Sequence, residues 1–343
     1  MMQDILTEPI FYLRAVHFAA TLSVSGAVFF VLFIAAPALR KAPGDDALRV
    51  ALYRRLARLG FTALALAVAS GAAWLLANAA IMSGETVSET LSDGTLWIVV
   101  AETMFGNDWL ARLVLACLLG AVMAPLFSPG RNTSLWLRIA AVVLAAAFAG
   151  SLAFAGHAAA GLGSAAIVHP AADTLHLIAA AAWAGTLFPL ALLLQAAGRD
   201  GASLALAQAA TLRFSSLGVA SVATLLFTGA INAWYLAGGI DALTETDYGR
   251  LLLAKVALFA IMVAIAAINR FALTPRLVQG AERDARVRAL NRLRLNAVIE
   301  VAIGAAIILI VAVLGRTPPG LHREHPAHMH QVMTTSAERT ALP

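Results

Sequence analysis

The sequence predicts an all-α membrane protein, a bundle of eight transmembrane helices whose N- and C-termini both lie on the outer side of the membrane. Apolar residues make up 61% of the 343 residues and charged residues 13%, and the mean hydropathy is +0.82. Such a composition excludes a soluble globular protein. Eight apolar runs reach the roughly 20 residues that a helix needs to cross a bilayer. Basic residues are concentrated in alternate connections between these runs.

Each predicted helix is a largely apolar run between polar connections. The runs are residues 10–36, 57–81, 109–127, 135–157, 171–196, 213–238, 248–272 and 295–315. We expect residues 1–315 to form one transmembrane domain and residues 316–343 to form a disordered outer tail rich in His and Met. Acidic residues precede the first run, where a cleaved signal peptide would be basic, so we expect this run to be an uncleaved first helix.

Lys and Arg set the orientation because they gather in cytoplasmic loops. The connections after the first, third, fifth and seventh runs are basic, whereas residues 82–108 are acidic and 158–170 hold no Lys or Arg. The net charge of +5 and the pI near 10 then reflect contact with anionic lipid at the inner leaflet rather than with nucleic acid. We expect the basic stretch 277–292 to be an amphipathic linker on the inner membrane surface.

In this orientation every histidine lies on the outer side. His17 lies about two turns into the first helix, His157 ends the fourth, His169 lies in the next outer loop and His176 begins the fifth. The other four lie in the tail, near two methionines. Imidazole and thioether together are typical copper ligands, and thioether favours Cu(I) over Cu(II). The candidate metal ligands are His17, His157, His169, His176, His322, His325, His328, His330, Met329 and Met333.

A few polar residues within the runs need an explanation, because polar groups in a membrane are costly. His17 is either a metal ligand or a core histidine with satisfied hydrogen bonds. We expect Arg14, on the same helical face, to extend to the lipid headgroups. Asp173 could orient an imidazole or add an oxygen ligand. Glu300, in an inner half, is either a step on an ion or proton path or the partner of a neighbouring arginine.

Several functions find no support in the sequence. There is no G-x-x-x-x-G-K-[ST] motif, so nucleotide binding is not expected. No serine or cysteine is placed beside a recognisable base, so we do not expect an enzyme. A single cysteine, Cys117, excludes an intrachain disulfide.

Motifs across residues 100–276 are similar to one family. They are Thr103-Met-Phe-Gly106 followed by Trp109 and Arg112, His176 with Trp183-Ala-Gly185, Thr228-Gly229-Ala-Ile-Asn232, Tyr248-Gly249-Arg250 with Lys255, and Asn269-Arg270. With them the chain resembles the CopD/PcoD copper-resistance family of bacterial inner-membrane proteins. The resemblance implies copper handling in the inner membrane, movement of copper toward the cytoplasm, and a small periplasmic copper-binding partner of the CopC type.

Two other functions stay open. Histidines on transmembrane helices also hold haem, so a haem b electron carrier could use two of His17, His157 and His176. A receptor that docks a periplasmic copper chaperone without transporting the ion would likewise carry ligands only on the outer side. A Soret band would identify the first, and copper accumulation in cells separates the second from a transporter.

Overall fold

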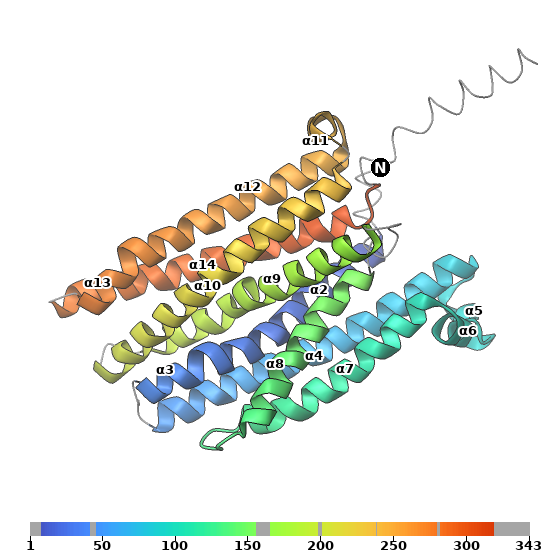
Figure 1. Cartoon of the computed structure of the whole chain (residues 1–343). Coiled ribbons are helices and arrows are strands. Elements are labelled where there is room, and N and C mark those ends of the chain that lie inside the picture. Colours follow the sequence, from blue (N-terminus) through green and yellow to red (C-terminus); the bar gives the residue numbers. More distant parts are fainter. Residues whose placement is uncertain are drawn as a thin grey trace, which may run out of the picture.

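The computed structural model describes residues 8–41, 46–155, 165–197, 201–237, 239–279 and 282–318. His157 and residues 319–343, which hold all the histidines and methionines of the tail, lie outside these residues. Within them, eight helical segments are long and apolar enough to cross a membrane, which confirms the all-α multi-spanning fold class (Figure 1).

The first four spans come from the first half of the chain. Span one is α2 (Pro9–Phe29), the π-helical η1 (Phe30–Ala35) and α3 (Ala36–Lys41). The others are α4 (Asp46–Ser83), α7 (Met104–Leu126), and α8 (Leu135–Gly150) with the 3-10 turn η2 (Ser151–Ala155). Residues between α4 and α7 form two short helices, α5 (Val87–Ser92) and α6 (Thr95–Glu102).

The last four spans follow the same order, with two long helices, a short helical segment and then two further spans. They are α9 (Ala165–Ala196), α10 (Gly201–Leu236), α12 (Asp247–Ile268) continued by η4 (Asn269–Leu273) and α13 (Thr274–Gln279), and α14 (Arg283–Leu314). The short helix α11 (Ile240–Glu245) precedes α12. An ion pair between Glu8 and Arg316 holds the beginning of the first span against the end of the last, at the same end of the bundle as α5, α6 and α11 (Figure 1). We call this the outer end, following the orientation predicted from the basic residues.

The helices extend well beyond the apolar runs. The expectation of a separate surface linker over 277–292 is wrong, because α14 begins at Arg283 and continues unbroken into the membrane span. Arginine is a good helix former and its long side chain can reach the headgroups from a helix that projects out of the bilayer. Arg294 in addition donates to the carbonyl of Leu194 at 2.7 Å, which anchors α14 against α9.

The two central helices, α2 and α9, meet at a pair of glycines. A Cβ at Gly26 would overlap the backbone of Gly185, and a Cβ at Gly185 would overlap the carbonyl oxygen of Leu22. Small residues let membrane helices approach this closely. The first span is accordingly the most enclosed of the eight, with 78% of its apolar window buried, whereas only 6% is buried in the span that begins at Asp247.

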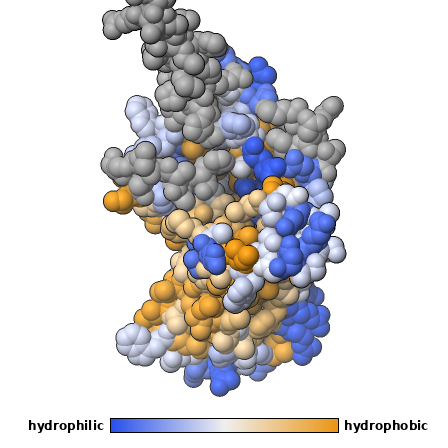
Figure 2. Space-filling view, turned by 90° about the vertical axis from the view of Figure 1, so that its right-hand side faces the viewer, coloured by the Kyte–Doolittle hydropathy of each residue, from blue (hydrophilic) through white to orange (hydrophobic). Residues whose placement is uncertain are grey.

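The outside of the bundle is apolar. Large side chains such as Phe227 and Phe271 are exposed. Exposed tryptophans stand near the ends of spans (Trp136 and Trp234) and on the short helix α6 (Trp97), where the amphipathic indole suits the headgroup region. Seen end-on, hydrophilic residues gather in patches beside broad hydrophobic surface (Figure 2). This distribution is what a bilayer environment requires.

Candidate metal-binding sites

His17 is held between α2 and α4. Its side chain is buried, and its Nδ1 lies 3.0 Å from the carbonyl oxygen of Ala67 and 3.3 Å from the Ser70 hydroxyl. Because a carbonyl oxygen can only accept, Nδ1 carries the proton and Nε2 presents its lone pair. The rings of Trp74 and Trp109 pack edge-on against the imidazole, with centroids 5.7 and 4.9 Å away.

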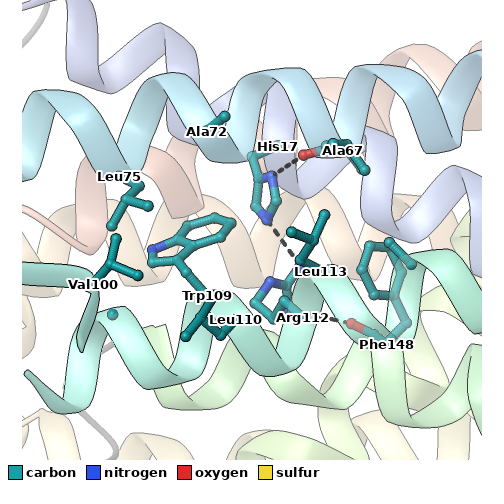
Figure 3. A pocket seen from close by; sticks show the side chains of 13 residues that line it. His17, Ala67, Ala72, Leu75, Val100, Trp109, Leu110, Arg112, Leu113 and Phe148 are labelled. Carbon is teal, nitrogen blue, oxygen red and sulfur yellow. Dashed lines mark hydrogen bonds between the residues drawn. The ribbon is translucent and has the colours of Figure 1, made fainter. Parts of the chain in front are cut away.

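Arg112 occupies that lone pair. Its Nη2 lies 2.8 Å from His17 Nε2, and its Nη1 donates to the Phe148 carbonyl (Figure 3). Nη2 also lies 3.2 Å from the Thr21 hydroxyl, and Nη1 also donates to Ser151. Both imidazole nitrogens are therefore used in hydrogen bonds. A metal ion could reach Nε2 only after the guanidinium had moved.

Arg14 adds a second positive charge to this region. Its guanidinium lies over the Trp74 ring at 4.9 Å from the centroid and its side chain is buried, so the expectation that it extends to the headgroups is wrong. The aromatic face supplies the stabilisation that the headgroups would otherwise give. Beside His17 lies a small cavity of about 120 Å³ with mainly apolar walls, among them Leu75, Trp109 and Leu113 (Figure 3).

A second group of polar residues lies between α9 and α10. His169 lies within α9 and not in a loop, so the expectation of a loop position is wrong; with Asp173 and His176 it follows the i, i+4, i+7 spacing of one helical face. Each has a partner on α10. The His169 ring stacks on Tyr235 at 5.5 Å, the Asn232 amide donates to Asp173 Oδ1 at 3.1 Å, and His176 Nδ1 lies 3.0 Å from the Thr228 hydroxyl. We call these six residues the α9–α10 seam.

The seam sets the tautomer of His176. The Thr228 hydroxyl donates its own proton to the Thr224 carbonyl at 2.7 Å, so it accepts from Nδ1 of the histidine. Nε2 of His176 therefore presents its lone pair, the arrangement in which imidazole binds metals. Lys255, on α12, interacts electrostatically with both His176 and Asp173.

The candidate ligands that the structure describes, His17, His169 and His176, are divided between these two places. His169 and His176 share one face of α9, about 10 Å apart along the axis at 1.5 Å per residue. His17 and His176 do not converge, because each lies nine residues before its contact glycine. Nine residues are two and a half turns, so each imidazole points away from the other central helix. Among the described residues, no group of three or more His, Cys, Asp or Glu side chains is close enough to hold one metal ion.

Sequence reasoning missed the residues that orient the imidazoles. Arg112, Ser70 and Thr228 were not among the candidate ligands, and they supply or occupy the hydrogen bonds of His17 and His176. A signal was present: Ser70 and Thr228 each precede a glycine, which leaves room for the imidazole against the helix backbone.

Glu300 lies apart, in the inner half. Its Oε2 accepts from the Asn269 amide at 3.1 Å, and the Asn269 oxygen in turn accepts from Asn296 at 2.6 Å. The partner of the carboxyl group is thus an amide of the π-helical turn η4, where sequence reasoning had proposed an arginine as one possibility. Glu300 Oε1 is buried without a hydrogen bond to the described residues, beside a cavity of about 520 Å³ between α9, α10, η4 and α14.

Comparisons with known proteins agree on one family. Residues 2–167 match the family described as Copper resistance protein D-like, N-terminal domain, and residues 208–314 match Copper resistance protein D. The inner membrane protein YebZ of Escherichia coli is 32% identical over 90% of this chain and 97% of its own length.

Two further relatives carry copper in their names. Copper resistance protein D of Pseudomonas syringae is 29% identical over 70% of this chain and 79% of its own length. The copper transport protein CutJ of Bacillus subtilis is 30% identical over 63% of this chain, which spans 37% of that longer protein. No solved structure matches. The eight spans and these matches show that the chain belongs to the copper resistance protein D family of multi-spanning inner-membrane proteins.

Proposed function

We propose that this protein takes copper from the periplasmic side of the inner membrane and moves it toward the cytoplasm. The observation that carries the proposal is the α9–α10 seam, where two imidazoles flank a carboxylate on one face of a transmembrane helix. His169 lies nearer the outer end of α9 and His176 lies two turns deeper, so copper would pass inward along this face by ligand exchange.

The chemistry of the seam suits a cation. Imidazole nitrogen is a good copper ligand, and the negative charge of Asp173 offsets part of the cost of a cation inside the bilayer. The seam would hold the ion weakly enough to release it, since the described residues bring no third ligand to His176. His157 and the tail residues His322, His325, His328, His330, Met329 and Met333 would capture copper, as Cu(I), from a CopC-like periplasmic partner.

The relatives' names support a role in copper resistance or copper transport, and they favour a carrier over an enzyme. The haem carrier is less well supported at His17, whose Nε2 is already bound by Arg112. A non-transporting receptor would use the same outer residues and differs only in what happens to copper in the cell.

Copper content of cells tests the proposal. Cells expressing the protein are expected to accumulate copper above an empty-vector control, and His176→Ala should remove most of the excess. Cys117→Ser is the matched control, because it removes a soft ligand that is exposed on α7, away from the seam. Equal accumulation with and without the protein would exclude transport and leave the receptor. An absorption spectrum of the purified protein completes the test, since a Soret band lost in His176→Ala would assign that residue to haem.

A further inference from the structure

The two halves of the chain repeat the same arrangement of elements. Residues 9–155 comprise a histidine-bearing helix, a second long helix, short helices at the outer end, a third span and a fourth span. Residues 165–314 comprise the same series, with α9, α10, α11, α12 and α14 in the corresponding places. Both halves begin at the outer end, so any equivalence between them is a parallel repeat.

The start of the third span is built in the same way in both halves. Thr103 caps α7: its hydroxyl donates to the Val99 carbonyl at 2.6 Å and accepts from Gly106 N at 2.9 Å. Thr246 caps α12 with a bond to Ala242 at 2.6 Å and one from Gly249 N at 2.9 Å. Both glycines, three residues after the threonine, press against the preceding short helix so closely that a Cβ would overlap its backbone.

The histidines also occupy equivalent positions. His17 Nδ1 is 3.3 Å from the Ser70 hydroxyl and His176 Nδ1 is 3.0 Å from the Thr228 hydroxyl. A glycine follows each hydroxyl residue, and a Cβ there would meet the imidazole Cε1 at 3.1 Å at Gly71 and 3.5 Å at Gly229. We call each imidazole with its flanking charged residues a station, the first around His17 and the second around His176.

The charged residues of the stations correspond as well. Arg112 stands six residues after Gly106, and Lys255 stands six residues after Gly249. Arg14 and Asp173 each stand three residues before the histidine, and each contacts the residue four positions after the hydroxyl residue. That residue is Trp74 in the first half and Asn232 in the second.

The contact between the halves fits a two-fold relationship. Gly26 and Gly185 each lie nine residues after their histidine, and they contact each other. Equivalent residues meet in this way where a two-fold axis passes between two copies of a unit.

We propose that the chain is a tandem duplication of a four-helix unit whose stations have diverged, so that the second station binds copper and the first is closed to it by Arg112. This inference rests on the proposed copper function and names the residue that decides between the stations. The first station places Arg14 and Arg112 around its imidazole, with one carboxylate, that of Asp108, interacting with Arg112. The second station balances Lys255 with Asp173. Two cations with one carboxylate leave a net positive charge that repels a further cation inside a low-dielectric bundle, whereas a balanced pair does not.

The test counts Cu(I) bound to the purified full chain in which the four tail histidines are replaced by alanine. We expect His176→Ala to weaken binding at least tenfold and His17→Ala to leave it unchanged. Arg112→Gln should add a second bound copper, which His17→Ala in the same chain removes. Arg112→Lys, which keeps the charge, is the matched control and should add none. Should Arg112→Gln not fold, Lys255→Gln serves instead, with tighter copper binding expected at His176.

Each result has a distinct meaning. Copper lost with His17→Ala and kept with His176→Ala would refute the claim that the second station binds copper and the first does not. The copper function itself would still stand. A folded Arg112→Gln protein that binds no more copper than its parent would overturn the role of Arg112. Absence of bound copper in every protein would refute the copper function itself, and the inference with it.

Discussion

The orientation of His176 depends on a hydroxyl group of the neighbouring helix. Thr228 accepts from Nδ1 and thereby directs the Nε2 lone pair away from α10. Groups that orient a metal-binding histidine commonly change metal affinity by about 10–100-fold when removed. Thr228 is thus a positioning residue for the seam.

Replacing Thr228 should therefore weaken copper binding without removing a ligand. We expect Thr228→Val to lower the Cu(I) affinity of the protein at least tenfold and Thr228→Ser to restore it, because serine keeps the hydroxyl. Chelator competition measures the affinity. Equal affinity for all three proteins would show that the His176–Thr228 bond serves packing only.

Glu300 allows a prediction about charge in the inner half. A buried carboxylate with an unbonded oxygen is costly, so the neutral carboxylic acid is favoured in this apolar setting. Glu300→Gln should then keep the thermal stability of the parent, whereas Glu300→Ala should cost about 1–3 kcal/mol because Asn269 loses its acceptor. Glu245→Gln, at an exposed position of α11, is the control. A large change in the unfolding temperature with Glu300→Gln would indicate an ionised group.

At the scale of elements, the contact between α2 and α9 determines where both imidazoles point. The glycines leave no room for a side chain, and the imidazoles, two and a half turns away, project from the opposite side of each helix and face the helices of their own halves. A change at this contact should affect the whole bundle.

Gly26→Ala is accordingly expected to destabilise the protein by about 1–3 kcal/mol or more, because the added methyl overlaps the Gly185 backbone. Gly304→Ala is the matched control. No atom lies within 4 Å of a Cβ at that position of α14, and alanine favours a helix by about 1 kcal/mol over glycine. Thermal unfolding in detergent compares the two. Similar unfolding temperatures for both variants would mean that the helices can separate at no cost.

Sequence reasoning succeeded for the elements because apolar length alone identifies a membrane span, and all eight were predicted. The ends of the helices were predicted less well, as at α14, because polar residues continue a helix beyond the lipid. Sequence reasoning could not assign partners: that His176 meets Thr228 and that Arg112 reaches His17 depends on which helices are neighbours. Hydropathy carries no information about that arrangement.

At the scale of the whole molecule, direction of transport depends on orientation in the membrane. Glu8 and Arg316 form an ion pair, so the first span begins and the last span ends on the same side of the membrane. The basic residues predict that this is the periplasmic side. The seam begins at that end with His169, and Glu300 lies toward the other.

Labelling of single cysteines in whole cells checks this orientation. In a Cys117→Ser background, Ser92→Cys at the end of α5 should react with a membrane-impermeant maleimide, because α5 lies at the outer end. Ser128→Cys, between α7 and α8, should react only after the membrane is opened, because this connection is basic and lies at the opposite end. Ser92 is exposed and Ser128 is half-buried, so labelling of each after the membrane is opened gives the reference for its own reactivity. The reverse pattern would place His169 and the stations toward the cytoplasm, and it would overturn the proposal that copper enters the seam from the periplasm.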